Sequence, residues 1–68
     1  MLSLHVHSVV RLKAAVPAEG LSRGEEGVVV SVWLSPKGLF YEVEFPKATG
    51  SAPTRALLPA VKLELVGS

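Results

Sequence analysis

The sequence predicts a single all-β domain over residues 1–68, a small and partly open barrel of five short strands. Three observations support this fold class. Valine-rich segments in which apolar residues alternate with a period of two recur along the chain. Glycine and proline separate these segments at short intervals, and no segment has the pattern of a long helix. Short strands in so small a chain cannot build two complete sheets, and a flat open sheet would leave long apolar edges, so partial closure is expected.

The first predicted strand covers about residues 6–13 and is followed by a long ordered loop at residues 14–26. Alternate residues of this strand share one side, and they are Val6, Ser8, Val10 and Leu12. The loop contains a proline and two glycines, so it cannot be one regular element. We interpret three glycines as structural turns, because glycine adopts the positive φ angles that sharp turns require. These are Gly20, Gly24 and Gly27.

The next predicted element is a hairpin made of residues 27–34 and 39–45. Its turn, Ser35-Pro36-Lys37-Gly38, places Pro36 where proline fixes the φ angle and Gly38 at the last position of a type I turn. If Leu34 lies opposite Leu39, one face carries only apolar pairs, namely Val32–Tyr41, Val30–Val43 and Val28–Phe45. The other face carries Trp33–Phe40, Ser31–Glu42 and Val29–Glu44. We therefore expect the first face to point into the core and the second face to be more exposed to solvent.

The last third of the sequence predicts a loop, two short strands and a tight turn between them. Residues 46–53 contain two prolines, a glycine and small residues, which is typical of an exposed and mobile loop. A strand is expected at about residues 54–58, a short turn or 3₁₀ turn at residues 59–61, and a final strand at about residues 62–66. The predicted elements follow the order found in SH3-like barrels. That order is a long loop after the first strand, a tight central hairpin, and a 3₁₀ turn before the last strand.

Composition and charge exclude several classes of function. Seven Lys and Arg residues against six Glu residues give a net charge of +1, so no strong field attracts nucleic acid or an anionic membrane. The absence of cysteine excludes disulfides, thiolate catalysis and cysteine zinc sites, and it fits a reducing cytoplasm. Neither a basic leader nor an apolar run of about 18 residues is visible, so we expect a soluble cytoplasmic protein with no membrane partner. A domain this small rarely holds a deep catalytic cleft, so we expect no enzymatic activity and no cofactor.

Two segments of the sequence carry a family resemblance. They read P-A-E-G-L-S-R-G-E-E-G-V-V-V at residues 17–30 and Y-E-V-E-F at residues 41–45. The pattern P-x-x-G-L-x-x-G-x-x-G-x-V-V followed by Y-E-V-E-F resembles a family of short bacterial domains of unknown function with an SH3-like fold. The resemblance covers about residues 8–66. It departs at Ser8, where the family often has an acidic residue, and at Val28, where it often has threonine.

This resemblance implies a small SH3-like barrel of bacterial origin and supplies no catalytic residues. It also implies membership of small gene modules in which such proteins accompany a toxin-like or enzymatic neighbour. A looser resemblance to the SH3-like portion of the nitrile hydratase β subunit points in the same direction, to a barrel that accompanies a larger protein. We therefore expect a non-enzymatic interaction module that binds a protein partner, for example as an antitoxin, an immunity protein or an accessory subunit.

An alternative function follows from the segment G-E-E-G-V-V at residues 24–29, which is similar to the core of a KOW motif. That resemblance implies an RNA-binding or ribosome-binding domain. Domains that bind RNA surround this turn with Lys and Arg, which neutralise phosphates. Here the surrounding loop has Glu19, Glu25 and Glu26 against Arg23 alone. Nucleic acid is therefore the second and less favoured class of partner.

The candidate binding surface is centred on Trp33 and Phe40, which stand opposite each other on the non-core face of the predicted hairpin. Lys37 and Arg55 are expected at its rim. Three interpretations of the aromatic pair remain open. The rings pack under residues 46–53 or a terminal segment, they form a homo-oligomer interface, or they bind a partner peptide or base by stacking.

Two further pairs of polar residues are expected to be ordinary surface. His5 and His7 lie two residues apart, but a zinc site would need a third ligand that only glutamate could supply, so we predict no metal site. Glu42 and Glu44 share the outer face of the predicted hairpin. Catalysis by paired carboxylates also needs a cleft that separates their pKa values, and an open sheet face provides none.

Overall fold

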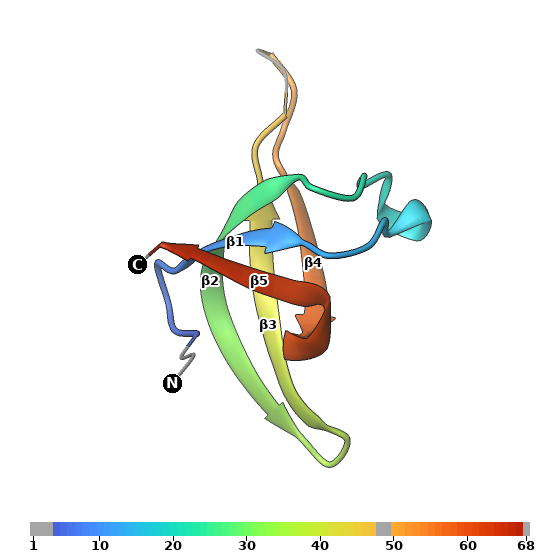
Figure 1. Cartoon of the computed structure of the whole chain (residues 1–68). Helices are drawn as coiled ribbons and strands as arrows, with labels where there is room; N and C mark the ends of the chain where they lie inside the picture. The colour runs from blue at the N-terminus through green and yellow to red at the C-terminus, as the bar shows by residue number, and fades with distance from the viewer. Residues whose placement is uncertain (1–3, 48–49, 68) are drawn as a thin grey trace.

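The computed structural model shown in Figure 1 describes residues 4–47 and 50–67. Within this part of the chain, five antiparallel strands form one sheet in the spatial order β4-β3-β2-β1-β5. The strands are β1 (Val9–Leu12), β2 (Glu26–Ser35), β3 (Gly38–Phe45), β4 (Thr54–Pro59) and β5 (Leu63–Gly67). The predicted all-β class with five strands is confirmed, and β4 and β5 are the two edges of the open sheet.

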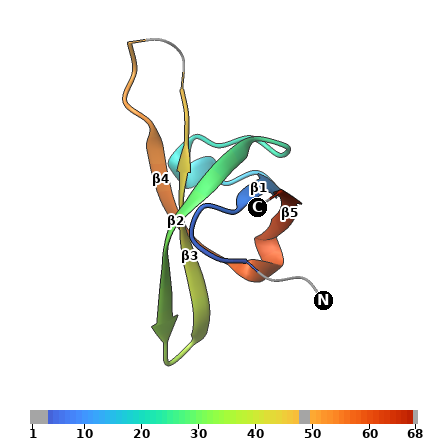
Figure 2. The ribbon, with the colours of Figure 1, turned by 90° about the vertical axis from the view of Figure 1, so that its left-hand side faces the viewer.

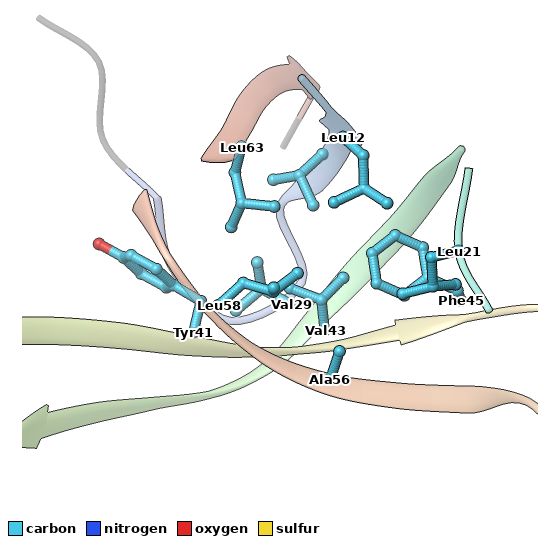
Figure 3. Close-up of a cluster of buried hydrophobic side chains, with 10 residues drawn as sticks. Leu12, Leu21, Val29, Tyr41, Val43, Phe45, Ala56, Leu58 and Leu63 are labelled. Atoms are coloured by element: carbon cyan, nitrogen blue, oxygen red, sulfur yellow. The ribbon is translucent and has the colours of Figure 1, made fainter. Parts of the chain in front are cut away.

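The sheet bends so that its two ends face each other across a core. The long hairpin of β2 and β3 forms one layer with β4, and β1 and β5 lie across one face of that layer (Figures 1 and 2). We call this covered face the inner face and the opposite one the outer face. Side chains from both layers meet between them (Figure 3). The buried core consists of Val10, Leu12, Leu21, Val29, Tyr41, Val43, Phe45, Ala56, Leu58 and Leu63.

Strand β1 is shorter than the predicted strand because the chain turns just before it. The backbone N–H of Ser8 donates to the carbonyl of His5 over 2.9 Å, and His7 has a positive φ angle of 78°. Ser8 is fully buried, and its Oγ accepts a hydrogen bond of 3.1 Å from the backbone N–H of His5. Val6, expected on the inner side of the strand, lies outside it and is exposed.

The hairpin of β2 and β3 has the predicted register at its tip and a different register near its base. Trp33 pairs with Phe40, as the turn predicts. A bulge at Val30 then shifts the register by one residue, so that Val29 pairs with Val43. The prediction that Val30 pairs with Val43 while Val29 points outward is therefore wrong, because Val29 is fully buried.

Three side chains that the predicted alternation assigned to the core are exposed instead. Val28 pairs with Glu44 and not with Phe45, so it lies on the outer face. Val32 and Leu34 keep the predicted face, but the hairpin extends beyond β1 and β5 (Figure 1). Their exposed fractions are consequently 41% and 84%. Burial along this hairpin thus depends on where the second layer ends as well as on alternation.

The turn between β2 and β3 is formed as the sequence predicts. Ser35 pairs with Gly38 across the two-residue connection made by Pro36 and Lys37. The hydroxyl of Ser35 accepts a hydrogen bond of 3.2 Å from the backbone N–H of Lys37 and donates one of 3.0 Å to the carbonyl of Gly38. Gly38 has a φ angle of 123°, which other residues rarely adopt. The serine and the glycine therefore both specify this turn.

The interpretation of Gly27 as a turn glycine is wrong. Gly27 lies inside a strand, where the lack of a side chain permits close packing. It lies in β2, where a Cβ atom would come within 2.7 Å of the carbonyl oxygen of Glu44. The same atom would lie 2.8 Å from side-chain carbons of Val43 and Phe45. Since carbon atoms in contact normally lie about 3.5–4.0 Å apart, any side chain at this position would force β2 and β3 to separate.

The predicted long loop between β1 and β2 is ordered around the buried side chain of Leu21. A 3₁₀ helix at Pro17–Glu19 is followed by Gly20, whose φ angle is 69°. Val16 and Leu21 then exchange two backbone hydrogen bonds of 2.9 and 3.1 Å. Gly24, with a φ angle of 89°, ends the loop where the chain enters β2.

The last two strands begin and end within one residue of the predicted positions, and a 3₁₀ helix at Ala60–Lys62 connects them. The predicted mobility of residues 46–53 falls partly on residues 48–49, which lie outside the described residues. Residues 50–53 are exposed. None of the helices formed by residues 4–47 and 50–67 is long and apolar enough to cross a membrane.

Candidate functional site

The residues predicted to form a binding surface are distributed between the outer face and the hairpin tip. Trp33 on β2 and Phe40 on β3 stand directly opposite each other, and Arg55 on β4 lies opposite Glu44 on the same face. Lys37 lies in the turn and is exposed. Trp33 is 55% exposed, whereas Phe40 is half-buried. The indole of Trp33 is therefore the main aromatic surface that the outer face offers to solvent.

A shallow hollow of about 360 Å³ lies beside Trp33 on the outer face. It is lined by Trp33, Glu42, Arg55, Ala56 and Leu57. The structure thus brings Trp33 and Arg55 together, while Phe40 and Lys37 do not line the hollow. The lining of the hollow therefore combines an aromatic ring, an aliphatic side chain and both signs of charge.

Leu57 is a member of this site that the sequence analysis did not identify. Its side chain is 56% exposed, and it stands opposite Glu42 in the pairing of β3 with β4. Leu57 and Leu58 are adjacent and equally apolar, so alternation alone cannot tell which of them faces the core. The signal that separates them is the cross-strand register, because the partner of Leu58 is the buried Tyr41.

A chain of hydrogen bonds fixes the orientation of the Trp33 ring. Its Nε1 donates to Oγ of Ser31 over 2.8 Å, and the same hydroxyl donates to Oε1 of Glu42 over 2.7 Å. Serine can make both bonds because its hydroxyl is at once a donor and an acceptor. The indole is consequently held toward Ser31 on the outer face of β2, where Trp33 lines the hollow.

The charged rim of the hollow is the guanidinium of Arg55 between two carboxylates, Glu42, which lines the hollow, and Glu44, which lies beside it. Nε of Arg55 donates to Oε1 of Glu44 over 3.0 Å, and Nη1 lies 3.9 Å from Oε2 of Glu42. The side chain of Arg55 is 59% exposed. Exposed ion pairs contribute only about 0–1 kcal/mol to stability, so these groups can exchange their partners for those of a ligand. The rim carries one positive and two negative charges.

A second and smaller hollow of about 200 Å³ lies where β1, β2 and the segment after β3 meet. It is lined by Val9, Glu26, Gly27, Val28 and Pro46. Val9 and Val28 are partners in the pairing of β1 with β2. Its lining has no aromatic ring and no cation, so it offers fewer groups for recognition than the hollow beside Trp33.

The glycine-rich segment that is similar to a KOW core uses its carboxylates within the fold. Oε2 of Glu25 accepts a hydrogen bond of 2.6 Å from the backbone N–H of Ser22, and Oε1 lies 3.3 Å from Nζ of Lys47. The Ser22 hydrogen bond is the main reason that the pKa of Glu25 is lowered, and Lys47 adds to it while desolvation opposes it. Glu26 forms an ion pair of 3.0 Å with Arg11. The segment therefore presents carboxylates where a phosphate would have to bind.

The histidines and the outer-face carboxylates are not assembled into a metal site or an enclosed catalytic site in the described part of the chain. His5 and His7 are exposed, and Nδ1 of His5 lies 3.0 Å from the carbonyl oxygen of Val6. Among residues 4–47 and 50–67, no group of three or more potential metal ligands comes together. Glu42 and Glu44 share Arg55 on an open sheet face.

Comparison with known proteins identifies one family. Residues 6–65, nearly the whole chain, match the family model described as a domain of unknown function, DUF4926. No curated protein and no solved structure matches the chain.

Proposed function

This chain belongs to the DUF4926 family of domains of unknown function, and we propose that it is a non-enzymatic interaction module that binds a protein partner through its outer face. The observation that carries this proposal is the hollow beside Trp33, with Leu57 as its second apolar wall and Arg55 at its rim. Tryptophan and arginine are enriched among the residues that contribute most to protein–protein binding. A large ring that is oriented in advance also loses little entropy on binding.

The chemistry of the hollow indicates what the partner segment contains. Trp33 and Leu57 would contact an apolar side chain, because both are more than half exposed and line the same hollow. The excess of negative charge on the rim, from Glu42 and Glu44 against Arg55, favours a basic side chain next to it. The exposed indole of Trp33 would also attract a Lys or Arg side chain. We therefore infer a segment with an apolar anchor beside a basic residue.

The arrangement of the carboxylates supports a role without catalysis. Glu42 and Glu44 are bound to the same guanidinium on an exposed sheet, so neither is enclosed in a site that would give them separate acid and base roles. A module of this size is suited to accompany a larger protein as an antitoxin, an immunity protein or an accessory subunit. The absence of cysteine is compatible with a bacterial cytoplasm as the place where it acts.

A selection from a random peptide library displayed on phage tests this proposal. We expect enriched peptides that pair an aromatic or aliphatic residue with Lys or Arg, and that shift the NMR signals of Trp33 and Leu57 when they bind. Leu57→Ala should weaken their binding at least tenfold, whereas Val61→Ala should leave it unchanged. Val61 is a matched control because it is 77% exposed and lies in the 3₁₀ helix Ala60–Lys62, outside the hollow. Peptides whose binding survives Leu57→Ala, or no enrichment at all, would contradict the proposal.

A further inference from the structure

Within residues 4–47 and 50–67, strand β2 has a free edge over its distal half. It pairs with β1 at Glu26–Val28, and Val29 then exchanges hydrogen bonds of 2.9 and 2.8 Å with Ser8 and His7. From Ser31 to Ser35, β2 pairs with β3 alone. Figure 2, which looks onto this side of the molecule, shows no other described segment running beside the lower half of β2. The described chain therefore leaves one side of this half strand without a neighbour.

The direction of the backbone groups along this edge follows from the pairing. The N–H and C=O of Val29 are directed away from β3, because they bind Ser8 and His7 on the other side. In an antiparallel pair, residues whose backbone groups point toward the partner strand alternate with residues whose groups point away. After the bulge, Ser31 pairs with Glu42 in the position that binds β3. The same alternation directs the backbone groups of Val32 and Leu34 to the free edge.

The side chains of this edge lack the features by which sheets usually avoid pairing with other chains. Charged residues and proline commonly protect exposed edges. The edge strand β4 carries Arg55 and Pro59, and the edge strand β5 carries Glu64. By contrast, no charged residue and no proline occurs from Gly27 to Ser35. The exposed fractions of Val32, Trp33 and Leu34 are 41%, 55% and 84%.

We propose that a second copy of this chain pairs with the free edge of β2 in antiparallel orientation, with the two-fold axis at Trp33. In this register Val32 lies opposite Leu34 of the partner subunit, and each such pair exchanges two backbone hydrogen bonds. The two Trp33 residues form the central pair that is not hydrogen-bonded, with Cβ atoms about 4.5–5.5 Å apart. In this way the backbone N–H and C=O groups of Val32 and Leu34 form hydrogen bonds on both copies.

A second copy fits this edge because the segment is complementary to itself. Trp33 pairs with Trp33 of the partner subunit, and Ser31 faces Ser35 of the partner subunit. No like charges meet, since the nearest charged residues in the sequence are Glu26 and Lys37. A pairing of five residues per chain buries less than the about 800 Å² per partner that is typical of stable complexes, so the dimer dissociates on dilution.

This dimer does not rest on the proposed function, although Trp33 belongs both to the hollow and to the new contact. Extending the sheet edge to edge leaves the outer faces of the two copies side by side. Arg55 and Leu57 lie on β4, at the far side of β3 from the new contact, so they stay uncovered. The dimer would therefore present two hollows on one face.

Single-cysteine variants test the register, because the chain has no cysteine of its own. Under mild oxidation, Trp33→Cys should form a disulfide-linked dimer, since the Cβ atoms of the two substituted positions lie next to each other across the two-fold axis. Leu34→Cys is the matched control on the same strand. Its thiol is offset from its equivalent by two residues, about 7 Å along the strand, and should cross-link at least tenfold more slowly. Equal rates for the two variants would overturn the proposed register.

Light scattering over a concentration series tests the association itself. The mass of the wild type should rise toward twice that of the monomer, and Val32→Lys should keep the protein monomeric by placing a charge on the edge. Val61→Lys, at an exposed site away from the edge, should behave like the wild type. Far-UV circular dichroism confirms that each variant is folded. A wild type that stays monomeric, or a dimer that survives Val32→Lys, would overturn the proposal without affecting peptide binding in the hollow.

Discussion

Trp33 and Ser31 lie two residues apart on the outer face of β2, and the indole Nε1 of Trp33 donates a hydrogen bond of 2.8 Å to the hydroxyl of Ser31. The same hydroxyl donates to Glu42 on β3. One serine therefore both fixes the ring of the candidate binding site and connects it to the neighbouring strand. Changing this serine should disturb the ring while leaving the core intact.

We expect Ser31→Ala to release the Trp33 ring at a modest cost in stability. Loss of two surface hydrogen bonds should lower the free energy of unfolding by about 1 kcal/mol. Trp33 is the single tryptophan of the chain, so its near-UV circular dichroism reports this ring directly. The tryptophan bands should weaken in Ser31→Ala and persist in Ser35→Ala, which changes a serine at the turn. Unchanged bands in Ser31→Ala would show that the hydrogen bond does not orient the ring.

We expect Gly27→Ala to be strongly destabilising although its backbone conformation suits any residue. The added methyl group would overlap the carbonyl oxygen of Glu44, which cannot move without separating two paired strands. Overpacking of this kind costs about 1–3 kcal/mol. Gly67→Ala is the control, because a Cβ atom there meets no atom within 4 Å. Urea unfolding of both variants measures the difference, and equal midpoints would show that the strands yield more easily than the contact distances indicate.

The lowered pKa of Glu25 makes the stability of the loop before β2 dependent on pH. Because the folded state binds this proton more weakly than the unfolded chain, Glu25 contributes stability above its unfolded pKa, and the contribution is lost as pH falls through the folded pKa. Glu25→Gln should therefore be less stable than the wild type at neutral pH. The gap should close in acid. Thermal unfolding as a function of pH measures it, with Glu19→Gln as control, and a gap independent of pH would contradict this assignment.

The KOW-like alternative makes a different prediction, about RNA. Since Glu25 binds Ser22 and Lys47 while Glu26 binds Arg11, the glycine-rich segment has few cations to neutralise phosphates. Titration of a fluorescent oligouridylate should show only weak binding that disappears as salt rises, and Arg23→Ala should change it little. Tight binding near physiological salt that is lost in Arg23→Ala would favour the RNA-binding function.

The tip of the central hairpin could be predicted from sequence, but its base could not. Ser35 and Gly38 specify the turn, and the turn fixes the pairs near it, so the predicted pairing of Trp33 with Phe40 is confirmed. Further along, three consecutive valines satisfy an apolar alternation in either phase. The bulge at Val30 decides between the phases, and it depends on contacts that local sequence does not encode.

The candidate site was only half predictable for a similar reason. The turn predicts that Trp33 lies on the non-core face of the hairpin, with Arg55 at the rim, and the structure places both in the lining of one hollow. Leu57 cannot be assigned from sequence because its neighbour Leu58 is equally apolar, and only the pairing of β4 with β3 shows which of them faces outward. Residues that are chemically distinctive can be assigned from sequence, whereas residues defined by register need the structure.

The position of Arg11 on β1 has a consequence for how fast the protein folds. Arg11 forms ion pairs with Glu26 on β2 and with Glu64 on β5, and 53 residues separate it from the latter. The central hairpin closes over a two-residue connection, so it can form within about 1–10 μs. Docking of β5 instead requires closure of almost the entire chain before any contact compensates the lost entropy. We expect this step to limit the folding rate, and the core around Leu63 to stay accessible to water until it is complete.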